Sequence, residues 1–418
     1  MAFQNKLKDD SFLGVLETSE VETALFQGFT LRSAFHPIIS IPHRRAVGYE
    51  ALVRASDDNG EPCSPLRLFT LPQSGKEHLQ LDRLCRSIHI PNFSRQATTD
   101  EWLFLNLNSQ GLESERPEMG LMTQLLSDSG IPPQRLVIEI LENEIDDREY
   151  LKGLIKHFRE MGCLIAIDDF GAGHSNFERI WELSPDIVKL DRSLIVRAAN
   201  SSKVKRILLG MVSLIHETGC LVVIEGVETK KEALIAIDVG ADMVQGFYFA
   251  LPDADISLNA DLDETLIALI GLQRDEAKKQ TKQLDQYFNR FHQLFEKAVS
   301  QFEIDHQFDS AAEMVFMETR AIRCFLLDET GYQIGKSIHA QRYKQELDKR
   351  VLPLLSGQNA SWSHKYYHFR AINQPGKMQV TRPYLSVAGL HMCITVSQSL
   401  EIEGHKFVFC CDLEWKDY

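Results

Sequence analysis

Seven short apolar runs in the first 245 residues each end on a polar residue. The runs are rich in β-branched residues and too short for helices, which is typical of strands buried on both faces. Such strands belong to parallel α/β sheets, whose two faces are covered by helices. The runs and their terminal residues are 46–49 with Glu50, 103–105 with Asn106, 136–138 with Glu139, 164–167 with Asp168 and Asp169, 187–188 with Lys189, 221–224 with Glu225, and 243–244 with Gln245.

Helical patterns alternate with these runs. They cover residues 66–90, 121–127, 149–161, 176–183, 202–218 and 230–239. Continuous alternation of this kind favours one barrel over two small domains. The predicted fold class is therefore α/β, with a TIM-like (β/α)8 barrel over residues 31–255.

The residues that end the runs carry the candidate chemistry. A closed β/α barrel gathers the carboxyl ends of its strands on one face, where catalytic groups lie. One acid at a strand end is usually a helix cap or a surface charge, but seven such positions in order predict a shared site. That site is acidic, rich in oxygen atoms and contains a single lysine, Lys189. Hard divalent cations such as Mg²⁺ prefer these ligands.

One region precedes the predicted barrel, and another lies between the barrel and the tail. Residues 1–30 are predicted to be a short lead-in with one helix at about 20–27. Residues 256–302 are predicted to be a helical linker, and its longest helical stretch, 261–302, contains no proline. This stretch is either a helix packed on its neighbouring domain or a dimerising signalling helix.

The tail, residues 303–418, predicts a separate α+β module with a mainly antiparallel sheet. Its strands are predicted at 321–327, 361–371, 393–396 and 407–411. Hairpin turns are predicted at 328–331, which reads Asp-Glu-Thr-Gly, and at 374–376, which reads Gln-Pro-Gly.

Composition narrows the classes of function. The 418-residue chain has a net charge of −14, so it lacks the basic surface that a DNA or RNA polymer requires, and no nucleic acid polymer is expected as a partner. Eight scattered cysteines without a CxxC spacing predict buried free thiols and a cytoplasmic location. The pattern predicts neither a signal peptide nor a membrane span.

Residues 49–54 read Tyr-Glu-Ala-Leu-Val-Arg, and further matching segments follow in order. They are Asn106, 139–142 (Glu-Ile-Leu-Glu), 168–173 (Asp-Asp-Phe-Gly-Ala-Gly), 189–191 (Lys-Leu-Asp), 225–229 (Glu-Gly-Val-Glu-Thr) and 245–247 (Gln-Gly-Phe). Together these segments resemble the EAL domain of bacterial cyclic-di-GMP phosphodiesterases. The resemblance covers a little over half of the chain.

The resemblance implies a homodimeric enzyme that hydrolyses cyclic-di-GMP to linear pGpG with two Mg²⁺ or Mn²⁺ ions. The implied metal ligands are Glu50, Asn106, Glu139, Asp168, Asp169, Glu225 and Gln245. The implied catalytic residues are Lys189, Glu50 and Glu142, of which Glu142 steadies the loop after Asp169. The implied substrate-binding residues are Leu52, Arg54, Asp191 and Glu228. For Asp191 and Glu228, a structural role is the alternative.

This set of residues is chemically consistent. Two divalent ions about 3.5–4 Å apart can neutralise a phosphodiester and lower the pKa of an attacking water. Lys189 would position that water first and transfer a proton second. Four positions differ from the residues common in the family, namely His36, Leu141, Ala172 and His174. These differences are expected to affect the rate of hydrolysis and its regulation more than the chemistry, because none of them removes a metal ligand. The alternative function is a non-catalytic cyclic-di-GMP receptor.

The tail resembles PAS-like or Cache-like sensor folds in segments 382–385, 393–396 and 411–413. This resemblance implies an unknown small ligand, and a purely structural dimerisation module is the alternative. The candidate pocket residues are Tyr367, Arg370, Tyr384 and Asp412. Two tryptophans of the barrel region, Trp102 and Trp181, are predicted to be core residues.

Overall fold

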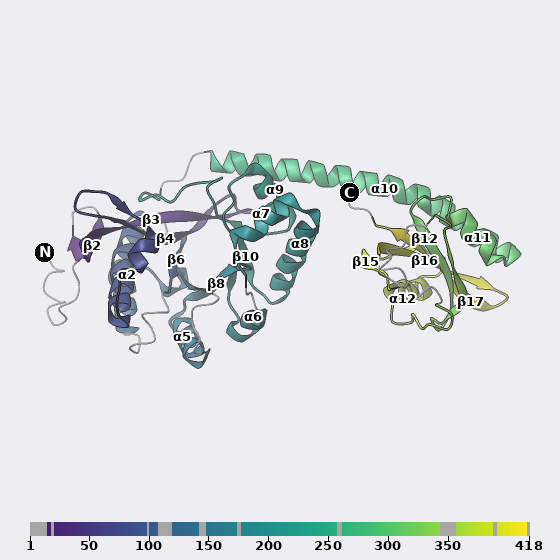
Figure 1. The fold of residues 1–418 in the computed structure, drawn as a ribbon, viewed down its shortest axis with the longest axis horizontal. Coiled ribbons are helices and arrows are strands. Elements are labelled where there is room, and N and C mark those ends of the chain that lie inside the picture. Colours follow the sequence, from purple (N-terminus) through teal and green to yellow (C-terminus); the bar gives the residue numbers. More distant parts are fainter. Residues whose placement is uncertain are drawn as a thin grey trace. The chain divides into compact units, whose positions relative to one another are not determined.

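The computed structural model describes residues 15–17, 21–97, 100–107, 119–141, 148–173, 177–256, 261–342, 357–387 and 391–415. The chain divides into two compact units, Met1–Asp275 and Glu276–Tyr418. Figure 1 shows the strands and helices of each unit. Of the residues singled out from the sequence, Glu142 and His174 lie outside the described residues.

Unit 1 contains a closed barrel of eight strands among its described residues (Figure 1). The barrel strands are β3 (Phe29–Ser40), β4 (Arg45–Ser56), β6 (Trp102–Asn106), β7 (Leu136–Leu141), β8 (Leu164–Phe170), β9 (Ile187–Leu190), β10 (Leu221–Ile224) and β11 (Met243–Val244). Strand β3 pairs with both β4 and β11 and so closes the barrel. The predicted TIM-like barrel is confirmed.

One strand runs against the others. Strand β3 is antiparallel to both of its neighbours, whereas the remaining barrel pairs are parallel. The expectation of a parallel sheet is therefore wrong for β3. Residues 41–44, which join β3 to β4, are too few for the crossover that parallel strands need.

Strand β4 contains one extra residue relative to β3. In the register of this pair, Ile38 lies opposite Gly48 and Ile39 lies opposite Ala46, so Val47 has no partner. This is a β-bulge, which bends the bulged strand and re-aims the side chains beyond it. Beyond the bulge, a Cβ at Gly48 would lie 2.6 Å from the ring of Phe104 on β6, so β4 leaves no room for a larger side chain there.

The helix predicted at residues 20–27 is wrong. Residues 22–26 form strand β2 (Glu22–Phe26), with alternating buried and exposed side chains. Strand β2 pairs with β3 through the turn residues Gln27 and Gly28, which both have positive φ angles. A two-residue turn of this kind matches the twist of antiparallel strands. Strands β1 (Val15–Glu17) and β5 (Pro62–Cys63) extend the same sheet.

The helices of unit 1 cover the barrel strands. They are α1 (Pro65–Phe69), α2 (Gly75–Gln96), α4 (Met119–Ser129), α5 (Arg148–Met161), α6 (Phe177–Leu183), α7 (Arg192–Asn200), α8 (Ser202–Glu217) and α9 (Lys230–Asp238). Helix α7 is missing from the helical stretches that the spacing predicts, although the basic stretch 192–206 indicates a solvated helix face; its N-cap is Asp191. Trp102 packs against Phe104 as expected, but Trp181 on α6 is 65% exposed and is not a core residue.

The barrel interior contains one layer of apolar side chains contributed by its strands. The buried members of this layer are Ile38, Phe104, Val137, Ala166, Ile187, Val223 and Met243. A separate and larger cluster lies between the strands and the helices. The strands are therefore buried on both faces, as the apolar runs predicted.

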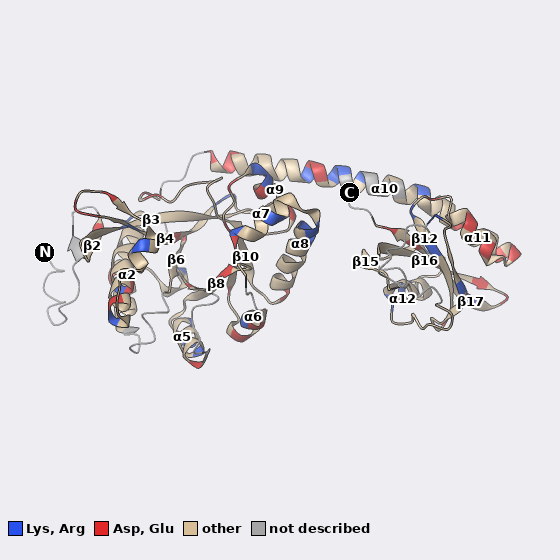
Figure 2. Ribbon diagram, viewed as in Figure 1, with Lys and Arg blue, Asp and Glu red and all other residues tan. Residues whose placement is uncertain are grey.

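Unit 2 is an α+β module. Helix α10 (Leu262–Asp305) begins in unit 1 and ends in unit 2, and charges of both signs follow one another along it (Figure 2). The other elements are α11 (Phe308–Val315), β12 (Ala321–Asp328), β13 (Gln333–His339), α12 (Tyr366–Asn373), β14 (Gln379–Val380), β15 (Tyr384–Leu385), β16 (Met392–Ile402) and β17 (His405–Glu414). The strands form one sheet with the order β13-β12-β17-β16-β14, and β15 also pairs with β16.

The predictions for the tail are partly confirmed. The strands at 321–327, 393–396 and 407–411 and the turn at 328–331 are present. The strand predicted at 361–371 is wrong, because residues 366–373 form α12 and bury Tyr367, His368 and Ala371. The turn at 374–376 therefore follows a helix and does not join a hairpin.

The two faces of this sheet have different coverings. One face packs on α10 and α11 through a cluster that includes Cys324, Leu326, Phe409 and Cys411. The other face packs on α12 through a cluster that includes Phe325. Neighbouring residues belong to opposite clusters because side chains alternate along a strand. No helix in the described part of the chain is long and apolar enough to span a membrane.

The packing predicts which aromatic residue stabilises unit 2. The Phe409 ring lies 5.0 Å from that of Phe308 and 5.3 Å from that of Phe295, measured between centroids. Phe409→Ala should lower the free energy of unfolding of unit 2 by about 3–5 kcal/mol, because a buried ring is lost and a cavity remains. Hydrogen exchange of β16 and β17 in increasing urea measures this loss. The control Phe369→Ala removes a ring that is 62% exposed, and an equal loss there would contradict the packing argument.

Candidate active site

Lys189 lies fully buried at the centre of an acidic cluster. Its Nζ atom is 2.6 Å from Glu139 Oε1, 2.7 Å from Glu225 Oε1, 3.1 Å from Asp168 Oδ1 and 3.6 Å from Glu50 Oε2. These carboxylates come from β4, β7, β8 and the residue after β10. The predicted acidic pocket with one lysine is therefore present.

The cluster is positioned by the two-residue period of the strands. Each site residue lies two positions after an inward-facing residue of the barrel layer, so its side chain points into the barrel as well. The pairs are Phe104 with Asn106, Val137 with Glu139, Ala166 with Asp168, Ile187 with Lys189, Val223 with Glu225 and Met243 with Gln245. Gly48 stands in the same relation to Glu50. The site is thus the next layer of the same barrel interior.

Two amides hold the Glu50 carboxylate. Asn106 Nδ2 donates to Glu50 Oε1 at 3.0 Å, and Gln245 Nε2 donates to Glu50 Oε2 at 2.8 Å. Burial alone would raise the pKa of Glu50, but the charge of Lys189 and these two hydrogen bonds lower it below its ordinary value. Glu50 is therefore held as an ionised, oriented carboxylate.

The other acids compete for one positive charge. Burial and neighbouring carboxylates raise the pKa of Asp169 to about 6 and that of Glu225 to about 8. Burial likewise raises the pKa of Glu139 well above its ordinary value, although Lys189 opposes the shift. The same carboxylates keep Lys189 protonated, and its pKa is raised despite burial. The site has more negative charge than one lysine can balance.

The oxygen atoms fit divalent cations. Ligand atoms of Glu50, Glu139 and Asp168 lie within 4.8 Å of one another, and so do those of Asp168, Asp169 and Glu225. The two groups share Asp168, so this carboxylate would be a ligand common to both groups. The Gln245 Oε1 atom is also buried and accepts no hydrogen bond from the described residues. An all-oxygen set of this kind suits hard divalent cations.

A local distortion brings two consecutive aspartates into one site. Side chains alternate on a regular strand, so Asp169 would point away from Asp168. The β8–β9 register shifts between Ile167 and Phe170, and Asp169 adopts a left-handed φ of 55°. Gly171 follows with a φ of 102°, and a Cβ there would lie 2.4 Å from Leu194. This turn therefore requires glycine at position 171.

A cavity of about 430 Å³ adjoins the acidic cluster at Asn106. Its lining includes two predicted substrate-binding residues, Leu52 and Arg54. Glu50, Leu52 and Arg54 lie on the same side of β4 because they are two positions apart. The cavity is also lined by residues of α1 and α2 that were not predicted, including Phe69 and Arg86. They could not have been predicted, because only the packing of these helices on β4 brings them to the site.

Asp191 and Glu228 have structural partners. Asp191 caps helix α7 by accepting a hydrogen bond from the Ser193 amide at 3.0 Å. Glu228 pairs with Arg192 at 2.5 Å. Asp191 also raises the pKa of Asp169 and so lies near the cluster. Their predicted contact with substrate stays a prediction.

His36 lies beside the acidic cluster. It is opposite Glu50 in the β3–β4 register, and its ring centroid is 5.8 Å from that of Phe247. Burial lowers the pKa of His36, and its Nε2 has no hydrogen-bond partner among the described residues. His36 is therefore a neutral side chain at the rim of the site.

Comparison with known proteins places this geometry in a family. The family model described as the EAL domain matches residues 19–252, more than half of the chain. The chain belongs to the EAL domain family. The match begins before residue 31, where the barrel was predicted to start, and includes strand β2.

Several curated proteins are similar to this EAL chain. The probable cyclic di-GMP phosphodiesterase PdeB of Escherichia coli is 28% identical over 53% of this chain and 43% of its own length. The cyclic di-GMP phosphodiesterase RocR of Pseudomonas aeruginosa is 32% identical over 31% of this chain and 34% of its own length. The chain thus spans less than half the length of these relatives.

Among solved structures, the YkuI protein of Bacillus subtilis shares the fold. It has a TM-score of 0.79 and 22% identity, and the match covers 93% of this chain and 97% of YkuI. The YkuI crystal structure contains an EAL domain with cyclic-di-GMP and calcium. BlrP1 of Klebsiella pneumoniae, in a complex with manganese and cyclic-di-GMP, has a TM-score of 0.51 and 25% identity over 59% of this chain and 60% of its own.

The charge balance at Lys189 predicts a stability effect. Lys189→Met removes the cation that four carboxylates contact, so the free energy of unfolding in EDTA should fall by about 3–5 kcal/mol. Added Mn²⁺ should restore more stability to this variant than it adds to the wild type, because it replaces the lost charge. Urea denaturation in EDTA and in Mn²⁺ measures both effects.

A surface lysine provides the control for this variant. Lys205 pairs with Asp238 at 2.6 Å, and both side chains are more than a third exposed. Lys205→Met should therefore change stability by less than about 1 kcal/mol, with no dependence on Mn²⁺. If Lys189→Met were as stable in EDTA as the wild type, the charge-balance interpretation would be wrong.

Proposed function

We propose that this protein is a bacterial signalling phosphodiesterase that hydrolyses cyclic-di-GMP to linear pGpG with Mg²⁺ or Mn²⁺. The observation that carries the proposal is the uninterrupted set of oxygen ligands around the buried Lys189. Two of the similar proteins, PdeB and RocR, are named cyclic di-GMP phosphodiesterases, PdeB as a probable one. Solved structures that share the fold contain cyclic-di-GMP with calcium or manganese.

The residues of the site have separate tasks in this reaction. The ligand set that shares Asp168 would hold two divalent ions, which would neutralise the phosphodiester and lower the pKa of the attacking water. Lys189 remains protonated in this surrounding, so it positions that water before it transfers any proton. The water loses one proton and its oxygen forms a bond to phosphorus, while the bond from phosphorus to the ribose 3′ oxygen breaks. The 3′ oxygen takes up one proton, so the overall reaction adds one water across the broken bond.

The adjoining cavity suits one half of the substrate. Leu52, Leu66 and Phe69 give it an apolar lining that can bury a planar guanine base. Arg54 provides positive charge for phosphate, whereas Arg86 is paired with Asp82 of the same lining and offers polar contacts to base edges. Strand β4 carries both Glu50 and Leu52. It would therefore hold the base-binding cavity and the metal ligands in a fixed position relative to each other.

The phosphodiesterase proposal predicts the effect of one isosteric change. Glu50→Gln keeps the shape of the side chain but removes the charge held by Asn106 and Gln245, so pGpG formation in Mn²⁺ should fall at least about 100-fold. Chromatographic separation of the products measures this loss. EDTA should abolish the wild-type reaction, because the acids of the site would then lack the cations that activate water.

A surface carboxylate controls for a general effect of charge. Glu61, after the β4 strand, is exposed, and Glu61→Gln should retain wild-type activity. If the wild type binds cyclic-di-GMP in Mn²⁺ without cleaving it, the non-catalytic receptor is the function. Ala172 and His174, which differ from the residues common in the family, would then be the first positions to replace with the family's residues.

We propose further that unit 2 is a PAS-like or Cache-like sensor that regulates the barrel. Among the described residues, one face of its antiparallel sheet packs on a short helix, α12. This face carries a buried cluster of aromatic side chains that could enclose a small ligand. Deletion of residues 303–418 should then change the hydrolysis rate of the barrel.

We propose that the protein acts as a homodimer in the cytoplasm. The eight cysteines are free thiols, in keeping with a reducing compartment. Trp181 is 65% exposed on α6, the helix that begins shortly after the loop at Gly171. A large exposed aromatic residue at this place suits a contact between two copies.

Exposed Trp181 provides a test of the dimer. Trp181→Asp should shift the protein towards monomer by at least about tenfold in dissociation constant, because a charge would be desolvated at the interface. Sedimentation over a range of concentrations measures the shift. The control Leu214→Asp on α8, where the side chain is 41% exposed, should leave the dimer intact, and equal sedimentation of wild type and Trp181→Asp would contradict this interface.

A further inference from the structure

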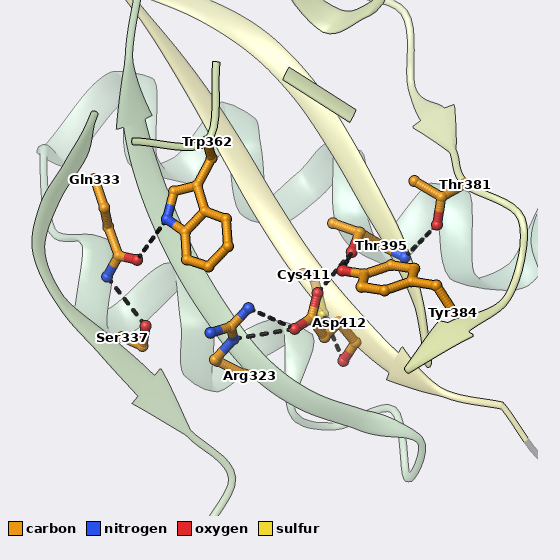
Figure 3. Close-up of polar contacts among 9 residues, drawn as sticks. All are labelled: Arg323, Gln333, Ser337, Trp362, Thr381, Tyr384, Thr395, Cys411 and Asp412. Atoms are coloured by element: carbon orange, nitrogen blue, oxygen red, sulfur yellow. Dashed lines mark hydrogen bonds and ion pairs between the residues drawn. The ribbon is translucent and has the colours of Figure 1, made fainter. Parts of the chain in front are cut away.

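Unit 2 contains a buried ion pair on the sheet face that α12 covers (Figure 3). Arg323 on β12 donates from Nε to Asp412 Oδ2 at 3.0 Å, and its Nη2 lies 2.7 Å from the same oxygen. The side chains of Arg323 and Asp412 are 5% and 0% exposed. The pair is therefore removed from solvent.

A chain of hydroxyl groups continues from this ion pair. Thr395 Oγ1 lies 2.7 Å from Asp412 Oδ1, and Tyr384 Oη lies 2.5 Å from Thr395 Oγ1. An ionised carboxylate only accepts hydrogen bonds, so Thr395 donates to Asp412 and Tyr384 donates to Thr395. Asp412 is thus fixed on both oxygen atoms.

The guanidinium group is held in one orientation. The ring of Phe325 lies 4.4 Å from Arg323 Cζ, measured to its centroid. The hydrogen bonds and ion pair of Arg323 to described residues use Nε and Nη2, which leaves the Nη1 edge without a partner among them (Figure 3). Burial would lower the pKa of Arg323, but Asp412 raises it, so the group stays charged.

Stability alone does not account for this ion pair. Desolvation of two charges offsets much of their attraction, and well-packed apolar residues usually stabilise an interior equally well. The surroundings are apolar and aromatic, with Phe325, Leu327, Tyr367 and Val408 buried on the same face. A fixed guanidinium edge in such a surrounding is typical of a site that recognises an anion.

We infer that Arg323 binds the carboxylate of a small organic acid or amino acid through its Nη1 edge, on the sheet face covered by α12. The inference rests on the proposed sensor function of unit 2 and names the class of its ligand. Asp412 and Thr395 are positioning residues that hold the guanidinium group. A singly charged carboxylate is favoured over phosphate or sulfate, because Asp412 already balances Arg323 and would repel a dianion.

Three of the pocket residues predicted from the sequence lie on this face: Tyr367, Tyr384 and Asp412. Arg370 is exposed on α12, where its guanidinium lies 5.4 Å from the centroid of the Tyr366 ring, and it is not part of the inferred site. Arg323 was not predicted, because it lies within an apolar run and reads as an interruption of a strand.

Titration calorimetry of the full chain tests the inference, with acetate, L-lactate and L-alanine as probes and sodium sulfate as the comparison anion. At least one carboxylate probe should bind saturably to the wild type, with sulfate at least tenfold weaker. The double variant Arg323→Met/Asp412→Leu should weaken that binding at least tenfold. It should still fold, because both charges are removed together and apolar residues replace them; thermal unfolding checks this.

A second variant separates charge at this site from charge elsewhere in unit 2. Arg370→Met makes the same change at an exposed position and should bind the probe as the wild type does. The inference is overturned if none of the three carboxylates binds, if sulfate binds equally well, or if the folded double variant keeps its affinity. Because binding is measured without cyclic-di-GMP, these outcomes are independent of whether the barrel is a phosphodiesterase.

Discussion

The mutual neutralisation of Lys189 and its surrounding carboxylates is the interaction on which the barrel interior depends. A lysine and four acids could not be buried separately, because each isolated charge would carry a large desolvation cost. With one oxygen of each acid within 3.6 Å of Lys189 Nζ, the charges make burial tolerable and leave an excess of negative charge. That excess makes the centre chemically suited to divalent cations.

The same principle takes a different form in unit 2. There the single positive charge of Arg323 is balanced by the single negative charge of Asp412. The group that is left to bind a ligand is the Nη1 edge of the guanidinium. The barrel site thus has surplus negative charge and suits cations, whereas the sheet site is neutral and suits a weakly charged anion. Each unit therefore has its own electrostatic selectivity, set by how completely its buried charges are paired.

Much of the barrel could be predicted from the sequence because its signal is local. A strand buried on both faces reads as an apolar run, and the polar residue that ends it marks the functional layer. The antiparallel direction of β3 could not be predicted, because an apolar run has no direction. The cavity wall from Phe69 and Arg86 depends on helix packing, and α12 was mistaken for a strand because its aromatic residues suit either structure.

The β-bulge at Val47 has a consequence for how this fold can change. Side-chain direction alternates along β4, so the extra residue decides which way Glu50, Leu52 and Arg54 face relative to the paired start of the strand. A deletion of one residue there would turn Glu50 and the cavity wall outward in a single step. This hairpin therefore tolerates a change of length only at its ends, whereas substitutions within it leave the direction of these side chains unchanged.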